Sequence, residues 1–570
     1  MELTEKGIQK TLFYAIYLLV AAALCIGVLM LLGTSYDAIV HRAVAILQRP
    51  DLEQAIRAKY FSPRKFKLFK AIFIPGGLAL LVLMLLALFR FGPRMLAAWI
   101  GGTRLCCRSI TAVFKAPADL TGVPRCLFWS GLLVYLVKSV VYIFWFPAQH
   151  DELWNYNTYI VQPFYYSCLV RNNYPLHNLI LNLADLLPFE NKEVLMRLPN
   201  LLIGTALYFF TFYGAKKISG NAFLAACAAI LMSVMPVVTF YTLYARGTLL
   251  ALLLSALFLY AAYRYVIYKN RSSVFWIVVA TVLGFYSIPT FLFPFVIGVF
   301  FIIAGRGMTR QVIKGLTAAL LLVALLYLPM LLGVGGSGII RDAAGRLPFH
   351  ELALVFKKFS LGVIAAFMGG AGEAVGIFLL LLTPFFYGKF KTGGMLWALL
   401  MFPFYSFWLL GYHVPVRAMP FVVVPVVTAW VLLIGRLQQV NRLCAGVVLL
   451  VLVAMYHWKT HNSAYLNWSV KSDREGLHLR TWLVQEQKNT LIDHTRSFFY
   501  YYPSIDYYTR QKNAPVQIVS GDPRSNRYLP GFKADSLHTV WVVDKDSAAA
   551  VARFKGWRYR KAGTSFIFYR

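Results

Sequence analysis

The stretch CLFWSGLLVYLVKSVVYIFWFP, residues 126–147, decides the fold. It is apolar apart from Lys138, and about 20 predominantly apolar residues are enough for a helix to cross a bilayer. The chain leaves this run through the segment Ala148-Gln149-His150-Asp151-Glu152-Leu153-Trp154. The sequence therefore predicts a transmembrane helix that ends next to a histidine and two adjacent carboxylates at one membrane surface.

Similar apolar runs recur along the chain up to residue 456, and about thirteen of them are long enough to span a membrane. The run at 274–304 is interrupted by Pro289 and Pro294, which predicts two short helices or one broken helix. The predicted spans are 12–33, 71–90, 126–147, 199–215, 221–240, 247–264, 274–288, 289–304, 312–331, 361–386, 394–411, 418–435 and 443–457.

Composition supports a membrane protein. Hydrophobic residues make up 59% of the 570 residues and charged residues 14%, whereas soluble domains average about 45–50% and about 25%. These values exclude a soluble enzyme and a disordered chain. The formal net charge of +33 does not indicate a nucleic-acid partner, because Lys and Arg collect in the cytoplasmic loops of polytopic membrane proteins.

Three regions follow from these patterns. Residues 1–125 form an N-terminal membrane region with two transmembrane helices and basic amphipathic segments, and residues 126–457 form a transmembrane core. Residues 458–570 carry charges at the density of a soluble domain and predict a small α/β domain, without a glycine-rich nucleotide-binding loop. Its predicted strands and helices are strands 516–519, 540–543 and 566–568, and helices 473–488 and 547–554.

The distribution of Lys and Arg predicts the orientation of the core. Acid-free basic loops lie near 216–217, 264–271, 306–314, 389–391 and 436–442, and we assign them to the cytoplasm. The outer side then holds loop 148–198, the turn near 241–246, the segments 333–360 and 411–417, and the C-terminal domain. The topology of 34–125 stays open, because segments 34–70 and 91–125 are both basic, and 95–114 could instead re-enter the membrane or lie in its interface.

The shortage of acids narrows the search for a catalytic base. Only 14 of the 23 acidic residues precede residue 457, and Asp151 and Glu152 are the pair that lies at the outer membrane surface. The alternative interpretation is that these two carboxylates only cap a helix N-terminus. Further polar blocks predicted on the same side are 171–180, 196–200, 240–248 and 412–420.

Together these blocks resemble the GT-C superfamily of membrane glycosyltransferases. The resemblance rests on Asp151-Glu152 after the first core span, Pro175-Leu176 at a helix start, and Arg197-Leu198-Pro199 at the next span. Ala245-Arg246-Gly247 and the late Arg417 complete the pattern. It covers roughly residues 126–456 and is most similar to the protein O-mannosyltransferases and the lipid A aminoarabinose transferase. The first two apolar runs look like an addition to the usual core.

The resemblance implies an inverting transfer of a sugar from a polyprenyl-phosphate-linked donor to a lipid, glycan or protein acceptor, on the outer face of the cytoplasmic membrane. It implies Asp151 as the base or as the carboxylate that binds the acceptor, with Glu152 as its catalytic neighbour. Because a lipid phosphate leaves in such a reaction, arginines and lysines should hold it; the candidates are Arg246, Arg417, Arg171 and Lys192. The candidate substrate-pocket residues are His150, Trp154, Tyr174, His177, Tyr244 and His413.

Several alternatives stay open. Residues 240–248 contain no acid, unlike many relatives, which argues against a two-acid site. A divalent metal on His150, His177, His413 and Glu152 is conceivable, but their spacing is not diagnostic. Lys138 lies in mid-span and is either functional or a snorkelling or paired charge. A transporter or flippase of a lipid-linked substrate, or a non-catalytic membrane scaffold, is the alternative function.

Overall fold

The computed structural model describes most of the helical part of the chain and five short strands of the C-terminal region. The described residues are 2–47, 53–55, 57, 62–146, 148–162, 166–169, 174–334, 349–368, 390–410, 418–461, 490–494, 516–520, 539–542, 558–562 and 565–569. Contacts between residues divide the chain into two units, Met1–Phe114 and Lys115–Arg570.

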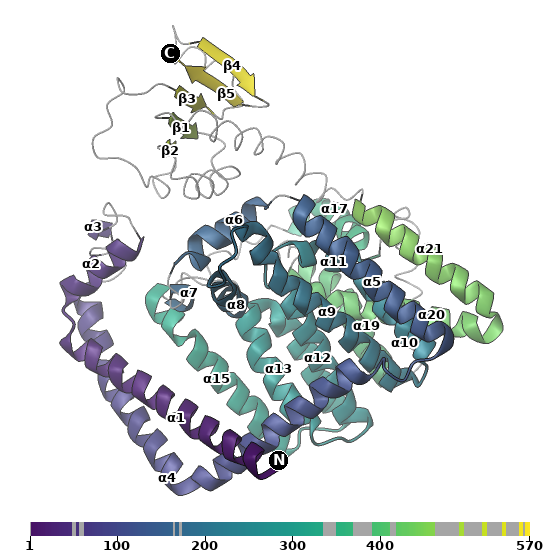
Figure 1. Cartoon of the computed structure of the whole chain (residues 1–570), viewed down its shortest axis with the longest axis horizontal. Helices are drawn as coiled ribbons and strands as arrows, with labels where there is room; N and C mark the ends of the chain where they lie inside the picture. The colour runs from purple at the N-terminus through teal and green to yellow at the C-terminus, as the bar shows by residue number, and fades with distance from the viewer. Residues whose placement is uncertain are drawn as a thin grey trace. The chain divides into compact units, whose positions relative to one another are not determined.

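The first unit is a helical hairpin of α1 (Glu2–Gly33) and α4 (Pro63–Lys115), joined through the short helices α2 (Tyr36–Leu47) and α3 (Glu53–Ala55) (Figure 1). Both long helices are apolar and long enough to cross a membrane. They lie side by side, because the Tyr17 hydroxyl donates to the Met84 carbonyl (2.5 Å) and the Lys70 ammonium to the Leu32 carbonyl (3.1 Å).

Helix α4 covers both the second apolar run and the basic segment 95–114 whose topology the sequence left open. It is assigned as one helix of 53 residues that contains Pro75 and Pro93, and its axis bends part-way along (Figure 1), as internal prolines allow. Residues 95–114 form the C-terminal part of α4, and their placement in or along the membrane stays a prediction.

The helical part of the second unit begins with α5 (Gly122–Trp145) and includes several short segments near the ends of its long helices. The remaining elements are α6 (His150–Asn155), the π-helix η3 (Tyr156–Ile160), α7 (Tyr166–Leu169), α8 (Pro175–Asp185), α9 (Lys192–Ser219), α10 (Ala222–Val234), α11 (Pro236–Leu243), α12 (Thr248–Ile267), α13 (Ser273–Ser287), η4 (Pro289–Phe291), α14 (Leu292–Gly305), α15 (Arg310–Val334), α17 (Phe349–Met368), α19 (Phe390–Leu410), η6 (Pro420–Val422), α20 (Val423–Val440) and α21 (Arg442–His461).

The expected order of helices is present, and the expected count of about thirteen spans stays a prediction. Among the residues that the structure describes, nine helices are long and apolar enough to cross a membrane, or up to ten if α10 and α11 form one broken span. The region 274–304 is two shorter apolar helices that meet at Pro289. The predicted span 361–386 is described only as far as Met368.

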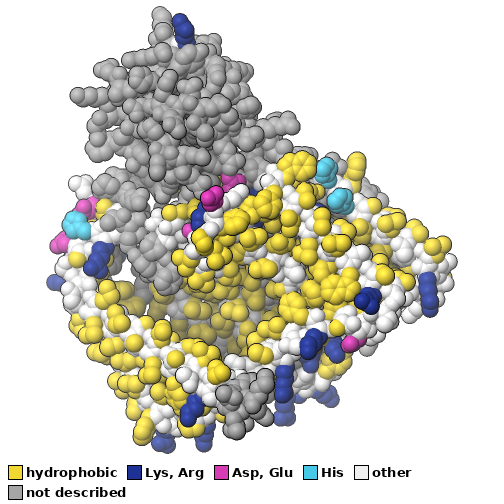
Figure 2. Space-filling model, in the orientation of Figure 1, with side chains coloured by type: hydrophobic (Ala, Val, Ile, Leu, Met, Phe, Trp, Pro, Cys, Tyr) yellow, Lys and Arg dark blue, Asp and Glu magenta, His cyan; other side chains and the backbone are white. Residues whose placement is uncertain are grey.

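Helices α10 and α12 lie in the middle of this bundle. Every residue of α10 from Ala225 to Val234 is buried, as expected for a helix that is hydrophobic on all sides. The axis bends by 58° between α10 and α11, where Pro236 begins the second helix and has no N–H group to continue the hydrogen bonding of the first. In Figure 2 hydrophobic side chains cover most of the visible described surface.

The basic loops of the second unit gather at one end of the bundle. The Tyr268 hydroxyl donates to the Lys217 carbonyl (3.2 Å), and Arg306 Nη1 to the Tyr265 carbonyl (3.1 Å). We call this the basic end; it also contains the turns between α9 and α10 and between α20 and α21. The turns after α5 and α11 lie at the opposite end, which we call the site end.

The C-terminal region contains a mixed five-stranded sheet with the strand order β2-β1-β3-β5-β4. Strand β1 is parallel to β2 and β3, and β5 is antiparallel to β3 and β4. Three strands coincide with predicted ones; β1 and β4 were not expected. The predicted helices 473–488 and 547–554 lie outside the described residues, so an α/β domain stays a prediction. The strands are β1 (Thr490–His494), β2 (Val516–Ser520), β3 (Thr539–Val542), β4 (Arg558–Ala562) and β5 (Ser565–Tyr569).

Candidate functional site

Glu152 is the central residue of a buried ion pair at the site end. Its carboxylate accepts from Arg197 through two bonds, Nη2 to Oε2 at 2.7 Å and Nε to Oε1 at 3.1 Å. The backbone N–H groups of Gln149 and Ala245 donate to the same carboxylate, both at 2.8 Å. The side chains of Glu152 and Arg197 are 0% and 1% exposed.

The remaining guanidinium nitrogen of Arg197, Nη1, also makes hydrogen bonds. Its Nη1 donates to the carbonyl of Ile143 at 3.1 Å and to the carbonyl of Phe146, which are acceptors at the C-terminus of α5 that have no partner within the helix. The Glu152–Arg197 pair therefore joins the end of α5, the start of α6, α9 and the turn after α11. Glu152 caps α6 through the Gln149 N–H, as the capping interpretation predicted, and its side chain is not exposed to solvent.

Asp151 has a different environment, although it is the next residue in the chain. Its side chain is 30% exposed, and its Oδ2 lies 2.9 Å from Arg246 Nη2. Arg246 is only 13% exposed, and its guanidinium lies 5.6 Å from the ring centre of Tyr174 and 5.2 Å from that of Tyr244. The Arg246 Nε is buried and makes no hydrogen bond. The site thus combines an accessible carboxylate with a guanidinium held between two aromatic rings.

Asn200 fixes the turn that carries Arg246. Its Nδ2 donates to the carbonyls of Tyr241 (3.0 Å), Tyr244 (2.6 Å) and Arg246 (3.3 Å). Its Oδ1 lies 2.8 Å from His177 Nε2, and since an amide oxygen only accepts, the imidazole carries its proton on Nε2. One side chain of α9 therefore determines the backbone path of residues 241–246.

His177 is completely buried. Burial lowers its pKa to about 4, against a smaller opposing effect of the hydrogen bond with Asn200, so the ring is neutral at physiological pH. Space around it is tight, because a Cβ added at Gly247 would lie 2.8 Å from Tyr174 Cδ1 and 3.1 Å from His177 Cβ. A glycine at 247 is required for this approach of the turn to α8.

The structure brings together Asp151, Arg246, Tyr174, Tyr244 and His177 of the predicted site. Trp154 is on α6 and 43% exposed, and His150 is the first residue of α6. Lys192 is bound elsewhere: its ammonium pairs with the Asp185 carboxylate (3.1 Å) and donates to the Asp185 carbonyl (3.0 Å). Three predicted residues lie outside the described part of the chain: Arg171, His413 and Arg417.

Sequence reasoning assigned no role to Arg197 and Asn200, which organise the site. Both are polar residues at the start of an otherwise apolar run, and an ionisable residue in a span is a functional candidate by default. That rule would have selected Arg197. Among the described residues, no group of three His, Cys, Asp or Glu side chains is placed to hold a metal ion.

No protein-family model matches the sequence, and no curated protein matches it. Two solved structures are similar in fold: ArnT from Cupriavidus metallidurans bound to undecaprenyl phosphate, and the same protein in the apo state. The first has a TM-score of 0.53 and 12% sequence identity, and the match covers 77% of this chain and 97% of that chain. The second has a TM-score of 0.50 and 12% sequence identity, and the match covers 76% of this chain and 97% of that chain.

The chain has an ArnT-like fold. ArnT is the lipid A aminoarabinose transferase, a GT-C glycosyltransferase, so the resemblance drawn from the Asp151, Arg197 and Arg246 motifs is confirmed at the level of the fold. This likeness agrees with the many long apolar helices of the described residues.

Proposed function

We propose that this chain is a membrane glycosyltransferase that moves a sugar from a polyprenyl-phosphate-linked donor to a lipid, glycan or protein acceptor. The observation that carries the proposal is the Asp151–Arg246 pair at the site end of an ArnT-like bundle. It supplies a proton acceptor and a phosphate-binding cation next to each other. That an ArnT structure is described as bound to undecaprenyl phosphate supports this donor class.

Arg246 is the proposed ligand of the donor phosphate. A guanidinium binds phosphate through parallel N–H groups, and its Nε has no other partner in this structure. The rings of Tyr174 and Tyr244 fix the plane of the guanidinium, which lowers the entropy lost when the phosphate binds. The phosphate then competes with Asp151 for the same cation.

Asp151 is the proposed base. When the phosphate takes Arg246, the carboxylate loses its positive partner and gains a negative neighbour, and both changes make it a better proton acceptor. The acceptor O–H or N–H gives its proton to Asp151 as its oxygen or nitrogen bonds to the anomeric carbon. The bond from that carbon to the phosphate oxygen breaks on the opposite face, and the electron pair leaves with the phosphate on Arg246. This single displacement inverts the anomeric centre.

Tyr244 contributes a hydrogen-bond donor. Burial raises the pKa of its hydroxyl well above the ordinary value, and the Asp151 carboxylate raises it further, against the opposing effect of Arg246. The hydroxyl therefore stays protonated at physiological pH. It can keep the Asp151 carboxylate oriented when the phosphate has replaced that carboxylate on Arg246.

Glu152 is a positioning residue in this proposal and not a second catalytic acid. Its two oxygens are occupied by Arg197 and by two backbone N–H groups. Asn200 has the corresponding function for the turn that carries Arg246. The reaction is assigned to the outer face of the cytoplasmic membrane, because the basic end, by the distribution of Lys and Arg, is cytoplasmic; the C-terminal region is then periplasmic.

The test is the substitution Asp151→Asn, with Asp119→Asn as its matched control. Asp119 is exposed and precedes α5 at the basic end, so the control makes the same chemical change away from the site. Glycolipids and glycoproteins are compared by mass spectrometry in cells that lack the gene and carry each variant. Asp151→Asn should reduce transfer by about 10²–10⁴-fold, the usual contribution of a general base, and Asp119→Asn should not.

Two outcomes would contradict the proposal. Full transfer by Asp151→Asn would remove Asp151 as the base. Movement of a lipid-linked sugar across the membrane by the wild-type protein, without any sugar transfer, would favour a flippase instead. Correct insertion and folding of each variant is checked by its elution and its melting temperature in detergent.

A further inference from the structure

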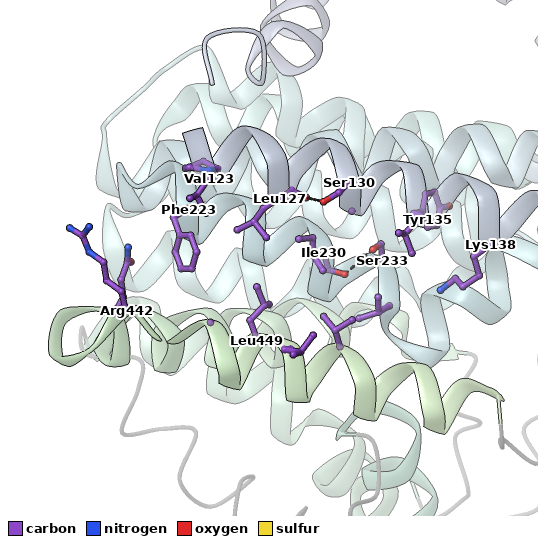
Figure 3. A pocket seen from close by; sticks show the side chains of 18 residues that line it. Val123, Leu127, Ser130, Tyr135, Lys138, Phe223, Ile230, Ser233, Arg442 and Leu449 are labelled. Carbon is purple, nitrogen blue, oxygen red and sulfur yellow. Dashed lines mark hydrogen bonds between the residues drawn. The ribbon is translucent and has the colours of Figure 1, made fainter. Parts of the chain in front are cut away.

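A cavity of about 820 Å³ lies on the side of the bundle between α5, α10 and α21 (Figure 3). Its lining is almost entirely apolar, with side chains such as Leu127, Phe223, Ile230 and Leu449. Several lining residues at its edges are strongly exposed; Val123, Val134 and Leu450 have exposed fractions of 63%, 60% and 68%. The cavity is therefore a groove that opens toward the membrane. We call it the lateral groove.

The lateral groove is separate from the candidate site. None of the residues that line it is Asp151, Arg246, Tyr174, Tyr244 or His177. It follows α5 from Val123 to Lys138, a rise of about 22 Å at 1.5 Å per residue, compared with about 30 Å for the hydrocarbon core of a bilayer. Lys138 closes the far end of the groove and donates to Thr239 Oγ1 at 2.9 Å. A long hydrocarbon chain thus fits its direction and length.

The other end of the lateral groove is positively charged. The three helices that form it all begin there, at Gly122, Ala222 and Arg442, and Figure 3 shows Val123, Phe223 and Arg442 at the same end. The positive ends of three helix dipoles therefore meet at this mouth. The exposed guanidinium of Arg442 adds a full charge, and the lining residues include no acid. An anion is favoured at this mouth.

We propose that the lateral groove binds one anionic phospholipid. Its acyl chain lies on the apolar residues of α5, α10 and α21, and its phosphate is held by Arg442 at the mouth. The mouth is at the basic end of the bundle, where Lys and Arg attract the anionic lipids of the adjacent leaflet. A neutral lipid would gain the apolar contacts without the charge pairing, so the headgroup charge distinguishes a specific site from the surrounding bilayer.

Gly446 keeps the lateral groove open. It lies on α21 in the lining of the groove, and a Cβ added there would meet no atom within 4 Å. A large side chain at 446 therefore projects into the groove without a collision with the backbone. The substitution Gly446→Trp fills the space of the acyl chain, whereas Arg442→Gln removes only the charge at the mouth.

The experiment uses the purified full-length protein. Retention of phosphatidylglycerol, phosphatidylcholine and a polyprenyl phosphate is measured by native mass spectrometry, and the rise of the melting temperature is followed as each lipid is added. The wild-type protein should prefer phosphatidylglycerol. Arg442→Gln should weaken that binding about fivefold, which corresponds to about 1 kcal/mol for one basic contact with an anionic lipid. Gly446→Trp should abolish retention of both lipids at this site.

Two control substitutions make the same chemical changes outside the groove. Arg436→Gln removes an exposed arginine of α20 that does not line the groove, and Gly394→Trp adds the same ring at an exposed glycine of α19 with open space around it. Both should bind like the wild type. Equal lipid retention by all four variants would overturn the proposal, and so would a preference for a polyprenyl phosphate over phosphatidylglycerol that is lost in Arg442→Gln. Sugar transfer is not the readout, so this test can fail independently of the proposed reaction.

Discussion

Removal of one member of the Glu152–Arg197 pair should destabilise the protein severely. Arg197→Met keeps a long unbranched side chain in α9 but leaves the Glu152 carboxylate with only the backbone N–H groups of Gln149 and Ala245. Glu152→Gln makes the reciprocal change and leaves the Arg197 charge without a counter-ion. Both partners are completely buried, so water cannot replace the missing charge in either variant.

The magnitude follows from the bonds that are lost. Arg197 makes two bonds to the carboxylate, and hydrogen bonds to charged groups contribute about 1.5–3 kcal/mol each. This agrees with the roughly 3–5 kcal/mol measured when one partner of a buried ion pair is removed. By contrast, Asp151 is 30% exposed and Arg246 13%, so solvent screens this pair in part and Asp151→Asn should cost less than either variant of the buried pair.

The assay is denaturation of the full-length protein in detergent, with melting temperature and elution volume measured for each variant. The order of stability should be wild type, then Asp151→Asn, then both pair variants far below. The double variant Glu152→Gln/Arg197→Met should be less destabilised than the sum of the two single variants, because the second substitution removes the charge that the first left unpaired. Wild-type melting of Arg197→Met, or strict additivity in the double variant, would refute the reasoning.

Three further outcomes are expected. Arg246→Lys keeps the charge but loses the planar guanidinium between the two tyrosine rings. The KM for the donor should therefore rise about tenfold, which corresponds to about 1.4 kcal/mol of binding free energy. An unchanged KM would exclude Arg246 as the phosphate ligand. The pKa of His177 falls from 6.5 to about 4 on folding, so the unfolded chain binds the extra proton and stability falls as pH drops from 6.5 toward 4. His177→Gln should flatten the dependence of melting temperature on pH in that range, and an equally steep profile in this variant would contradict the assignment. Gly247→Ala should cost about 1–3 kcal/mol through overpacking against Tyr174, whereas Gly446→Ala, in open space, should melt close to the wild type.

Hydrophobic runs were enough to predict most of the helices, because the bilayer requires the same length of apolar chain wherever it is crossed. Proline divides two of the runs: 221–240, predicted as one span, is the two helices α10 and α11 with Pro236 at the break, and 274–304 is two shorter helices, as one of its two predicted forms has it. Strand β4 was missed because its sequence, RYRKA, is rich in charge. It lies at the edge of the sheet, where charged residues are common and protect against aggregation.

The candidate site was predicted only as a set of residues and not as an arrangement. Asp151 and Glu152 are neighbours in the chain, but consecutive residues of a helix face different directions, and one is accessible whereas the other is buried. Nothing in their spacing indicates which of them meets Arg197 and which meets Arg246. That depends on α9 and on the turn after α11, which are brought to α6 only by the packing of the bundle.

The hydrogen bonds of Asn200 limit how this protein could be re-engineered. One amide holds the carbonyls of Tyr241, Tyr244 and Arg246 and also the ring of His177. A graft of the 241–247 turn from another protein of this fold would arrive with carbonyls placed for a different anchor. Positions 177 and 200 would have to be transplanted together with the turn, so for directed evolution the three segments are one exchangeable module and not three independent sites.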